Sequence, residues 1–241
     1  RKPNLGQVPS DPKYRKLFVA SPGYTLVGAD LSAIELRCLA HMLSRYDTTY
    51  ADTLLNDDIH QVNADKLGIT RSQVKTVQYS FLYGASNLKI GQSFDSSLSN
   101  DEASKKGADI KAAFIQAIPG LDKLLAACES AFKRGFLRSI DGRRVFLDSK
   151  HKTLNFLLQS TAAVIAKTWM IIANENIKQL GIEAHQLAFV HDELQYETPP
   201  LHVQDLQTSL VLAAAAAGEY YNFRVPISAE AKTGSSWAET H

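Results

Sequence analysis

The stretch Gln186-Leu-Ala-Phe-Val-His-Asp-Glu-Leu-Gln-Tyr-Glu197 predicts two short β-strands joined by a tight turn. Apolar and aromatic residues recur at positions 187–190 and 194–197, and the three residues between them are polar. Such a hairpin pushes an acid, Asp192, out of an apolar strand. We therefore expect Asp192 to stand on the turn at the end of a strand.

A second acid, Asp30, ends another predicted strand, residues 24–29, in the context Val27-Gly-Ala-Asp-Leu-Ser32. Two carboxylates that meet on neighbouring strands repel unless a divalent cation lies between them. Mg²⁺ takes hard oxygen ligands and is commonly shared between carboxylates and substrate phosphates. Two such ions would support an in-line phosphoryl displacement, in which a primer 3′-hydroxyl attacks an α-phosphate. The alternative is that the two acids are ordinary helix or turn caps.

A helical stripe is the strongest indication of a substrate. Arg71, Lys75, Tyr79 and Tyr83 recur every fourth residue, in a segment that Thr70 can cap. A nucleoside triphosphate needs this combination, because its phosphates bind fixed positive charge while its base and sugar offer flat or apolar surface to a ring. The stripe therefore predicts a nucleotide-binding helix.

The rest of the chain predicts helices with one basic hairpin. The segment 1–23 is typical of extended coil, and 86–98 has a mixed pattern. Asp141-Gly142 predicts a two-residue hairpin turn within 136–147. Helices are expected at 32–45, within 56–70, at 101–133 with a break at Pro119-Gly120, at 153–180 and at 203–221.

Composition is that of a soluble globular protein, with 45% hydrophobic and 21% charged residues in 241. The net charge of +1 gives no overall attraction to nucleic acid, so any such binding needs a local patch. A solvated hairpin face is the alternative interpretation of the one basic cluster. Seven cations form that cluster: Lys133, Arg134, Arg138, Arg143, Arg144, Lys150 and Lys152.

Cysteine and apolar patterns exclude several classes of protein. Cys38 and Cys128 have no metal-ligand spacing, which argues against a metal centre or a disulfide framework. The longest apolar run, 210–217, is shorter than the roughly 20 residues of a membrane helix, and no signal peptide opens the chain. We expect a cytoplasmic protein without a membrane partner.

Three segments resemble motifs A, B and C of the family A (DNA polymerase I-like) DNA polymerases, in that order. They are Asp30-Leu-Ser-Ala-Ile-Glu-Leu-Arg37, the stripe at 71–84, and Val190-His-Asp-Glu193. The stretch that begins Asn155-Phe-Leu-Leu-Gln159 resembles the family's further helix that tracks the primer-template. The resemblance covers essentially the whole chain and is strongest to the replicative polymerases of short-tailed bacteriophages. It implies a DNA-directed DNA polymerase of phage DNA replication, acting in the cytoplasm of the infected cell.

The implied fold is α+β, a right-hand palm with an antiparallel sheet flanked by helices and a helical fingers subdomain. The palm would comprise residues 1–55 with motif A and 136–241 with the DNA-tracking helix and motif C. The fingers would comprise residues 56–135, with motif B at about 71–84.

The resemblance also implies roles for single residues. Asp30 and Asp192 would hold two Mg²⁺ ions, with the carbonyl of Leu31 as a backbone ligand. Arg71, Lys75 and His60 would bind the triphosphate, and Lys75 would be a catalytic donor toward the leaving pyrophosphate. The sequence alone would class His60 as structural.

Two further residues would select the sugar. Glu35 would close off the 2′ position, although the sequence alone would class it as a solvated helix residue. Tyr79 would pack on the incoming base and sugar, and Tyr at this position goes with poor rejection of dideoxynucleotides in the family. Ala33 departs from the commoner motif A and lacks a polar contact that some relatives make. A larger set would contact DNA: Tyr83, Gly84, Arg143, His151, Asn155, Gln159 and His191.

The expected partners are primer-template DNA, deoxynucleoside triphosphates, a processivity factor and an upstream polymerase half. In the family a thumb and usually an exonuclease precede this segment, so we expect a C-terminal fragment that is weak or inactive alone. Two other functions compete with polymerisation: a non-catalytic DNA-binding remnant or split-polymerase subunit, and a two-metal nuclease. A nuclease has no need for the stripe or for Glu35.

Overall fold

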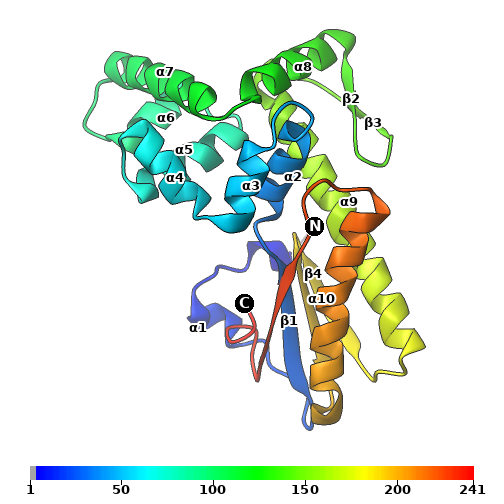
Figure 1. Ribbon diagram of the computed structural model, residues 1–241. Coiled ribbons are helices and arrows are strands. Elements are labelled where there is room, and N and C mark those ends of the chain that lie inside the picture. Colours follow the sequence, from blue (N-terminus) through cyan, green and yellow to red (C-terminus); the bar gives the residue numbers. More distant parts are fainter. Residues whose placement is uncertain (1–3) are drawn as a thin grey trace. The chain divides into compact units, whose positions relative to one another are not determined.

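The computed structural model describes residues 4–241 and shows an antiparallel four-stranded sheet with strand order β4-β5-β1-β6 (Figure 1). The strands are β1 (Thr25–Leu31), β4 (His185–Val190), β5 (Glu193–Thr198) and β6 (Ala229–Gly234). The predicted α+β class with an antiparallel sheet is confirmed. The first three residues of the predicted coil, 1–3, lie outside the described residues.

The chain forms two compact units by its contacts. The sheet unit contains residues 4–34 and Ala162–His241, and the helical unit contains Glu35–Thr161. Four short helices are η1 (Leu5–Gln7), α1 (Pro12–Arg15), η2 (Lys150–Lys152) and η3 (Pro200–His202).

Two long helices, α9 (Thr153–Gln179) and α10 (Val203–Tyr220), bury apolar side chains in the sheet unit. The helix α10 runs along β1 and β6 (Figure 1). The indole of Trp169 is fully buried and donates a 2.8 Å hydrogen bond to the carbonyl of Leu210, which joins the two helices. The hydroxyl of Tyr196 on β5 donates to Asn174 on α9 at 3.0 Å. Both predicted helices are confirmed.

A polar set of side chains occupies one face of β1 and β5. Asp30 pairs with Glu193 in the register, and Gly28 pairs with Gln195. A Cβ atom at Gly28 would lie 2.3 Å from the carbonyl oxygen of Thr240 and 2.3 Å from the amide of Gln195. Glycine at this position therefore lets the segment 236–241 pack directly on the sheet.

Helices dominate the helical unit. They are α2 (Ile34–Leu43), α3 (Thr49–Asn56), α4 (Ile59–Leu67), α5 (Arg71–Leu82), α6 (Asn87–Phe94), α7 (Asn100–Ala117) and α8 (Leu121–Arg134). The predicted stripe helix is confirmed as α5, and Thr70 forms a capping box with Gln73. The mixed segment 86–98 contains α6, and the break at Pro119-Gly120 separates α7 from α8.

The basic hairpin has a longer turn than predicted. It is built from β2 (Phe136–Arg138) and β3 (Arg144–Phe146), and the amide of Ser139 donates to the carbonyl of Arg143. Three residues therefore form the loop, with Gly142 at φ 83°. The prediction of a two-residue Asp-Gly turn was wrong, because a turn closed by a left-handed glycine uses the same dipeptide.

Glycines allow α6 and α7 to pack closely. A Cβ atom at Gly91 would lie 1.8 Å from the carbonyl oxygen of Ala103, and one at Gly107 would lie 1.9 Å from that of Asn87. The helices α6 and α7 can therefore pack this closely only because these two positions have no side chain.

Among the described residues, one helical run, Lys150–Gln179, is long and apolar enough in composition to cross a bilayer. Buried helices of globular proteins share this composition. Within this run Ile165, Trp169 and Ala173 are completely buried, and Trp169 is hydrogen-bonded to α10. We therefore describe α9 as a core helix.

Candidate functional site

The sheet unit brings Asp30 and Asp192 together. Asp192 lies in the two-residue turn between β4 and β5, next to His191, which adopts φ 58°. The amide of Leu31 donates a 3.0 Å hydrogen bond to the carbonyl of Asp192, so the turn is fixed to the end of β1. The sequence-based expectation that the two acids meet on neighbouring strands is confirmed.

Carboxylate charges accumulate at this point of the sheet. Partial burial, followed by the nearby charges of Asp192 and Glu193, raises the pKa of Asp30 to about 6. His241 and Lys232 act in the opposite direction. The ionised form of Asp30 is thus disfavoured in the absence of a cation, which is the electrostatic condition that a bound divalent ion relieves.

The donor set at the sheet consists of hard oxygens. Asp30 is exposed, Asp192 is half-buried, and the side chain of Leu31 is buried. Within residues 4–241, no group of three or more His, Cys, Asp and Glu side chains is arranged to hold a metal ion. Two carboxylates therefore suit an ion that takes its remaining ligands from backbone, water or substrate.

A cavity of about 370 Å³ adjoins Asp30 on the same face of the sheet. It is lined in part by Glu230 and Lys232 of β6 and by His241. Strand β6 pairs Glu230 with Asp30, which places a further acid and a cation beside the candidate site.

In the helical unit, the stripe on α5 lies beside His60 of α4. The guanidinium of Arg71 donates to Asp58 at 2.7 Å, and Asp58 also caps α4. His60 lies 3.1 Å from the side-chain oxygen of Gln78, whose amide donates to Tyr50 at 2.7 Å. Burial and then the charge of Arg71 lower the pKa of His60. The arrangement orients His60 and Arg71 on one surface.

Three rings follow one another along this surface. The ring of Tyr79 lies 6.3 Å from that of His60 and 6.3 Å from that of Tyr83, with which it is nearly parallel. The hydroxyl of Tyr83 donates a 2.5 Å hydrogen bond to Glu35. Lys75 is exposed on the same helix. Sequence reasoning assigned Glu35 and Tyr83 to different ligands, and the structure joins them directly.

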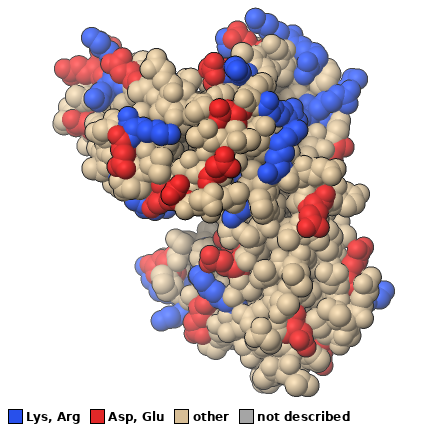
Figure 2. Space-filling view, viewed as in Figure 1, with Lys and Arg blue, Asp and Glu red and all other residues tan. Residues whose placement is uncertain are grey.

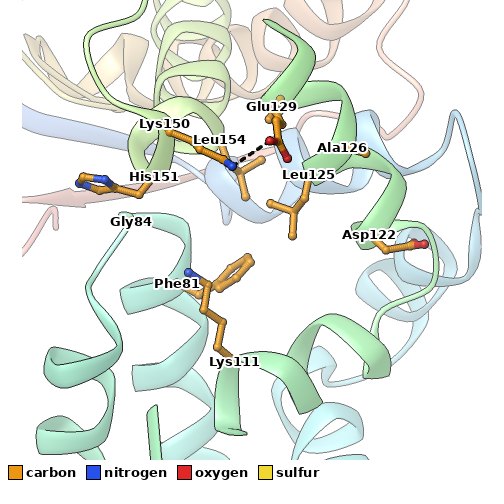
Figure 3. A pocket seen from close by; sticks show the side chains of 11 residues that line it. Phe81, Gly84, Lys111, Asp122, Leu125, Ala126, Glu129, Lys150, His151 and Leu154 are labelled. Carbon is orange, nitrogen blue, oxygen red and sulfur yellow. Dashed lines mark hydrogen bonds and ion pairs between the residues drawn. The ribbon is translucent and has the colours of Figure 1, made fainter. Parts of the chain in front are cut away.

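A second cavity, of about 550 Å³, opens in the helical unit beside Gly84 and His151 (Figure 3). Apolar walls come from Phe81, Leu125 and Leu154, and Figure 3 shows the ion pair of Lys150 with Glu129, 2.8 Å long. A Cβ atom at Gly84 would lie 2.7 Å from the carbonyl oxygen of His151, so glycine is required there. Asn155 is half-buried and Gln159 exposed on α9.

All seven residues of the basic cluster are exposed, and Figure 2 shows Lys and Arg gathered around α8 and the hairpin. Arg143 is paired with Asp141 at 2.5 Å. The guanidinium of Arg144 lies over the ring of Phe136, at 4.7 Å from its centroid. The cluster therefore contains both cations in ion pairs and cations that lie over a ring.

Sequence reasoning missed the network around Glu193. Its buried carboxylate accepts from Trp237, Gln195 and His241. Gln195 is only two residues away, but Trp237 and His241 are 44 and 48 residues away, so no local pattern could have indicated those two. The acid itself stood beside Asp192 in the sequence, and its burial was the missing information.

The model of DNA polymerase family A matches residues 1–239. This chain belongs to DNA polymerase family A. It is 30% identical to the DNA-directed DNA polymerases of Enterobacteria phage T3 and of Escherichia phage T7, in each case over 99% of this chain and 38% of the relative. DNA polymerase I of Pseudomonas aeruginosa is 28% identical, over 99% of this chain and 28% of that protein.

A solved family A structure has the same fold. The polymerase domain of Pol1 from M. smegmatis, in complex with DNA primer-template and dNTP, superposes with a TM-score of 0.85 at 27% identity. The match covers 99% of this chain and 45% of that one. The chain thus spans less than half the length of these family A relatives.

Proposed function

We propose that this chain carries the active site of a DNA-directed DNA polymerase that adds deoxynucleotides to a primer 3′-hydroxyl by a two-metal mechanism. The pairing of β1 with β5, which sets Asp30 against the Asp192 turn, is the observation that carries the proposal. Family membership and the likeness to a polymerase domain with bound primer-template and dNTP support it.

The carboxylates of Asp30 and Asp192 suit a divalent cation because their negative charges lie close together. Asp30, Asp192 and the carbonyl of Leu31 would hold Mg²⁺, and no soft ligand lies among them. Bound Mg²⁺ would make the primer hydroxyl a better nucleophile and stabilise charge on the leaving pyrophosphate.

The helical unit would bind the nucleotide. Arg71 and Lys75 would hold phosphate oxygens by charge-assisted hydrogen bonds, and Lys75 would donate toward the leaving pyrophosphate. His60, on the neighbouring helix α4, would be a further partner of the triphosphate. Tyr79 would cover the sugar and base.

Glu35 would exclude a ribose 2′-hydroxyl, and its hydrogen bond from Tyr83 supports that role. The bond fixes the Glu35 carboxylate beside Tyr83, the last of the three rings in the row. A held side chain rejects an extra hydroxyl better than a mobile one, because it cannot move aside without breaking the bond.

DNA would contact the helical unit and the turn of the sheet unit. Tyr83 and Gly84 would lie under the templating pair, while His151, Asn155, Gln159 and His191 would contact the minor groove or the primer end. Arg143 would bind phosphate. In these terms residues 1–55 and 136–241 are palm and 56–135 are fingers. The contact-based units change at residues 34/35 and 161/162 instead.

We further propose that activity needs the polymerase length that this chain does not span, as an upstream thumb and exonuclease half, and that a processivity factor assists it. The relatives are more than twice as long. Losing the phosphate contacts of a thumb weakens DNA binding steeply with salt. The cytoplasm of an infected bacterium would be the place of action.

Incorporation of one labelled deoxynucleotide into a primer-template tests the proposal. It should depend on Mg²⁺, follow the template and be lost in Asp192→Ala, with DNA affinity retained. Cleavage of the primer in place of extension would favour a nuclease. DNA binding without extension, even with the upstream half supplied, would favour a non-catalytic remnant.

A further inference from the structure

Glu193 is a buried acid beside a site that already has two others. It is 4% exposed, it pairs with Asp30 across β1 and β5, and it follows Asp192 in the chain. Burying a carboxylate is costly unless its oxygens are hydrogen-bonded. A third carboxylate, that of Glu193, therefore lies beside the proposed metal site, and hydrogen bonds from the protein must hold it in place.

Both oxygens of Glu193 are engaged. Oε1 accepts from the indole Nε1 of Trp237 at 2.5 Å and from the amide of Gln195 at 2.6 Å. Oε2 lies 2.8 Å from Nδ1 of His241. Because a carboxylate can only accept, Nδ1 of His241 is the donor. The three donors thus engage both oxygens of Glu193.

His241 connects Glu193 with the cavity beside Asp30, because it is hydrogen-bonded to Glu193 and also lines that cavity. The segment that carries it is held to the sheet independently, since Thr240 exchanges hydrogen bonds with Gln195 and Gly28 leaves the space for its backbone. Replacing the imidazole would free one carboxylate oxygen and leave the segment attached.

We propose that Trp237 and His241 act as a latch on Glu193 that keeps this carboxylate from serving as a metal ligand beside Asp30 and Asp192. His241 and Glu193 are positioning residues, and the inference rests on the proposed function of the two aspartates. Without the latch, Oε2 becomes available to a cation in the site. Metal binding should then strengthen while the geometry for nucleotide addition worsens.

Mn²⁺ binding to the 241-residue chain, followed by electron paramagnetic resonance of the free ion, tests the latch without requiring activity. His241→Ala should bind Mn²⁺ about threefold more tightly, the effect of one nearby charge in a water-like dielectric. Glu193→Gln should bind it more weakly. His241→Ala added to Glu193→Gln should cause no further change, because the oxygen it would release no longer carries charge.

Two variants act as controls. His241→Gln keeps a donor near Oε2 and should restore the wild-type Mn²⁺ affinity. His202→Ala removes a histidine of the sheet unit outside the network and should change nothing. A thermal melt of each variant shows that it is folded.

In a primer-extension assay with the upstream half supplied, His241→Ala should lower kcat about tenfold, as loss of a residue that orients metal ligands does. KM for the nucleotide should stay within about twofold of wild type, since the latch touches no nucleotide contact.

Several outcomes would overturn the latch. Weaker or unchanged Mn²⁺ binding in His241→Ala would do so, as would an equal effect of that change in the Glu193→Gln background. Equal Mn²⁺ binding by the wild type and Asp192→Ala would instead contradict the proposed metal site and with it the latch. Binding that depends on Asp192 but not on His241 contradicts the latch alone.

Discussion

Asp30 and Glu193 face one another across β1 and β5 on one face of the sheet, and only Asp30 is exposed. The exposed acid is available to a ligand, whereas the buried one is occupied by three donors. Of these two carboxylates on paired strands, Asp30 is therefore a candidate metal ligand, whereas Glu193 has a supporting role.

Asp30 should make stability depend on pH. Its pKa is raised from 3.8 to about 6, so the folded, metal-free chain binds more protons than the unfolded chain between these values. The free energy of unfolding therefore falls as pH rises through this window. Asp30→Asn should remove this slope and be more stable than wild type near neutral pH, by only about 1 kcal/mol because the group is partly exposed and solvent screens its charge.

Urea unfolding in the presence of a chelator, at several pH values from about 4 to about 7, measures this effect. Asp205→Asn, an exposed acid in the first turn of α10, is the matched control. An unchanged pH slope in Asp30→Asn would show that the raised pKa is not a property of the folded chain.

Tyr79 should set the response to dideoxynucleotides. Its hydroxyl can offer a hydrogen bond where the 3′-hydroxyl is missing, so the wild type should be terminated readily. Tyr79→Phe removes one hydrogen bond and should raise discrimination against dideoxynucleotides about tenfold. Competitive incorporation of a dideoxy and a deoxynucleotide measures the ratio. Extension that is the same with and without dideoxynucleotides in the wild type would refute the role.

Arg143 and Arg144 should differ in what they contribute to DNA binding. Arg143 is already paired with Asp141, so a phosphate must compete with that carboxylate, and Arg143→Ala should lower the salt dependence by less than a full phosphate contact. Arg144→Ala should lower the slope of log affinity against log salt by about 0.9, the value for one phosphate contact. Fluorescence anisotropy at several salt concentrations compares them. Equal slopes for both variants and wild type would indicate a solvated face.

Gly107→Ala should reverse the usual effect of this exchange in a helix. Alanine normally stabilises a helix interior by about 1 kcal/mol relative to glycine. Here the new methyl group would meet the carbonyl of Asn87 at 1.9 Å, so the two helices must separate. We expect a loss of about 2 kcal/mol, typical of overpacking, in chemical denaturation. The exposed Ser104→Ala on the same helix should stay near wild type, and a stabilised Gly107→Ala would contradict the crossing.

Local sequence patterns predicted those helices, strands and turns that are determined by the residues within them. The Asp192 turn, the stripe helix and α9 follow from periodicity and caps over a few residues. Strand β6 was missed because Ala229-Glu-Ala-Lys-Thr-Gly234, although its small apolar and polar residues alternate, has no large apolar or aromatic residue and only Thr233 as a β-branched one. It becomes a strand by pairing with β1, about 200 residues earlier, as the register shows.

The candidate site likewise has parts that could be predicted from the sequence and parts that could not. Asp30, Asp192 and the stripe could be predicted from sequence and from the resemblance to the family. The bond of Tyr83 to Glu35 and the latch on Glu193 could not, because each joins residues more than 40 positions apart. The roles assigned to single residues stay predictions until variants are measured.

Template-directed incorporation of a single labelled deoxynucleotide, by the chain supplied with its upstream half, tests the central claim most directly. Rapid-quench rates should fall by about 10²-fold or more in Asp192→Ala, since removing preorganised stabilisation of the reacting charge costs at least that. The affinity for primer-template should change little. An Asp192→Ala variant that adds the nucleotide at the wild-type rate would contradict the assignment of the active site.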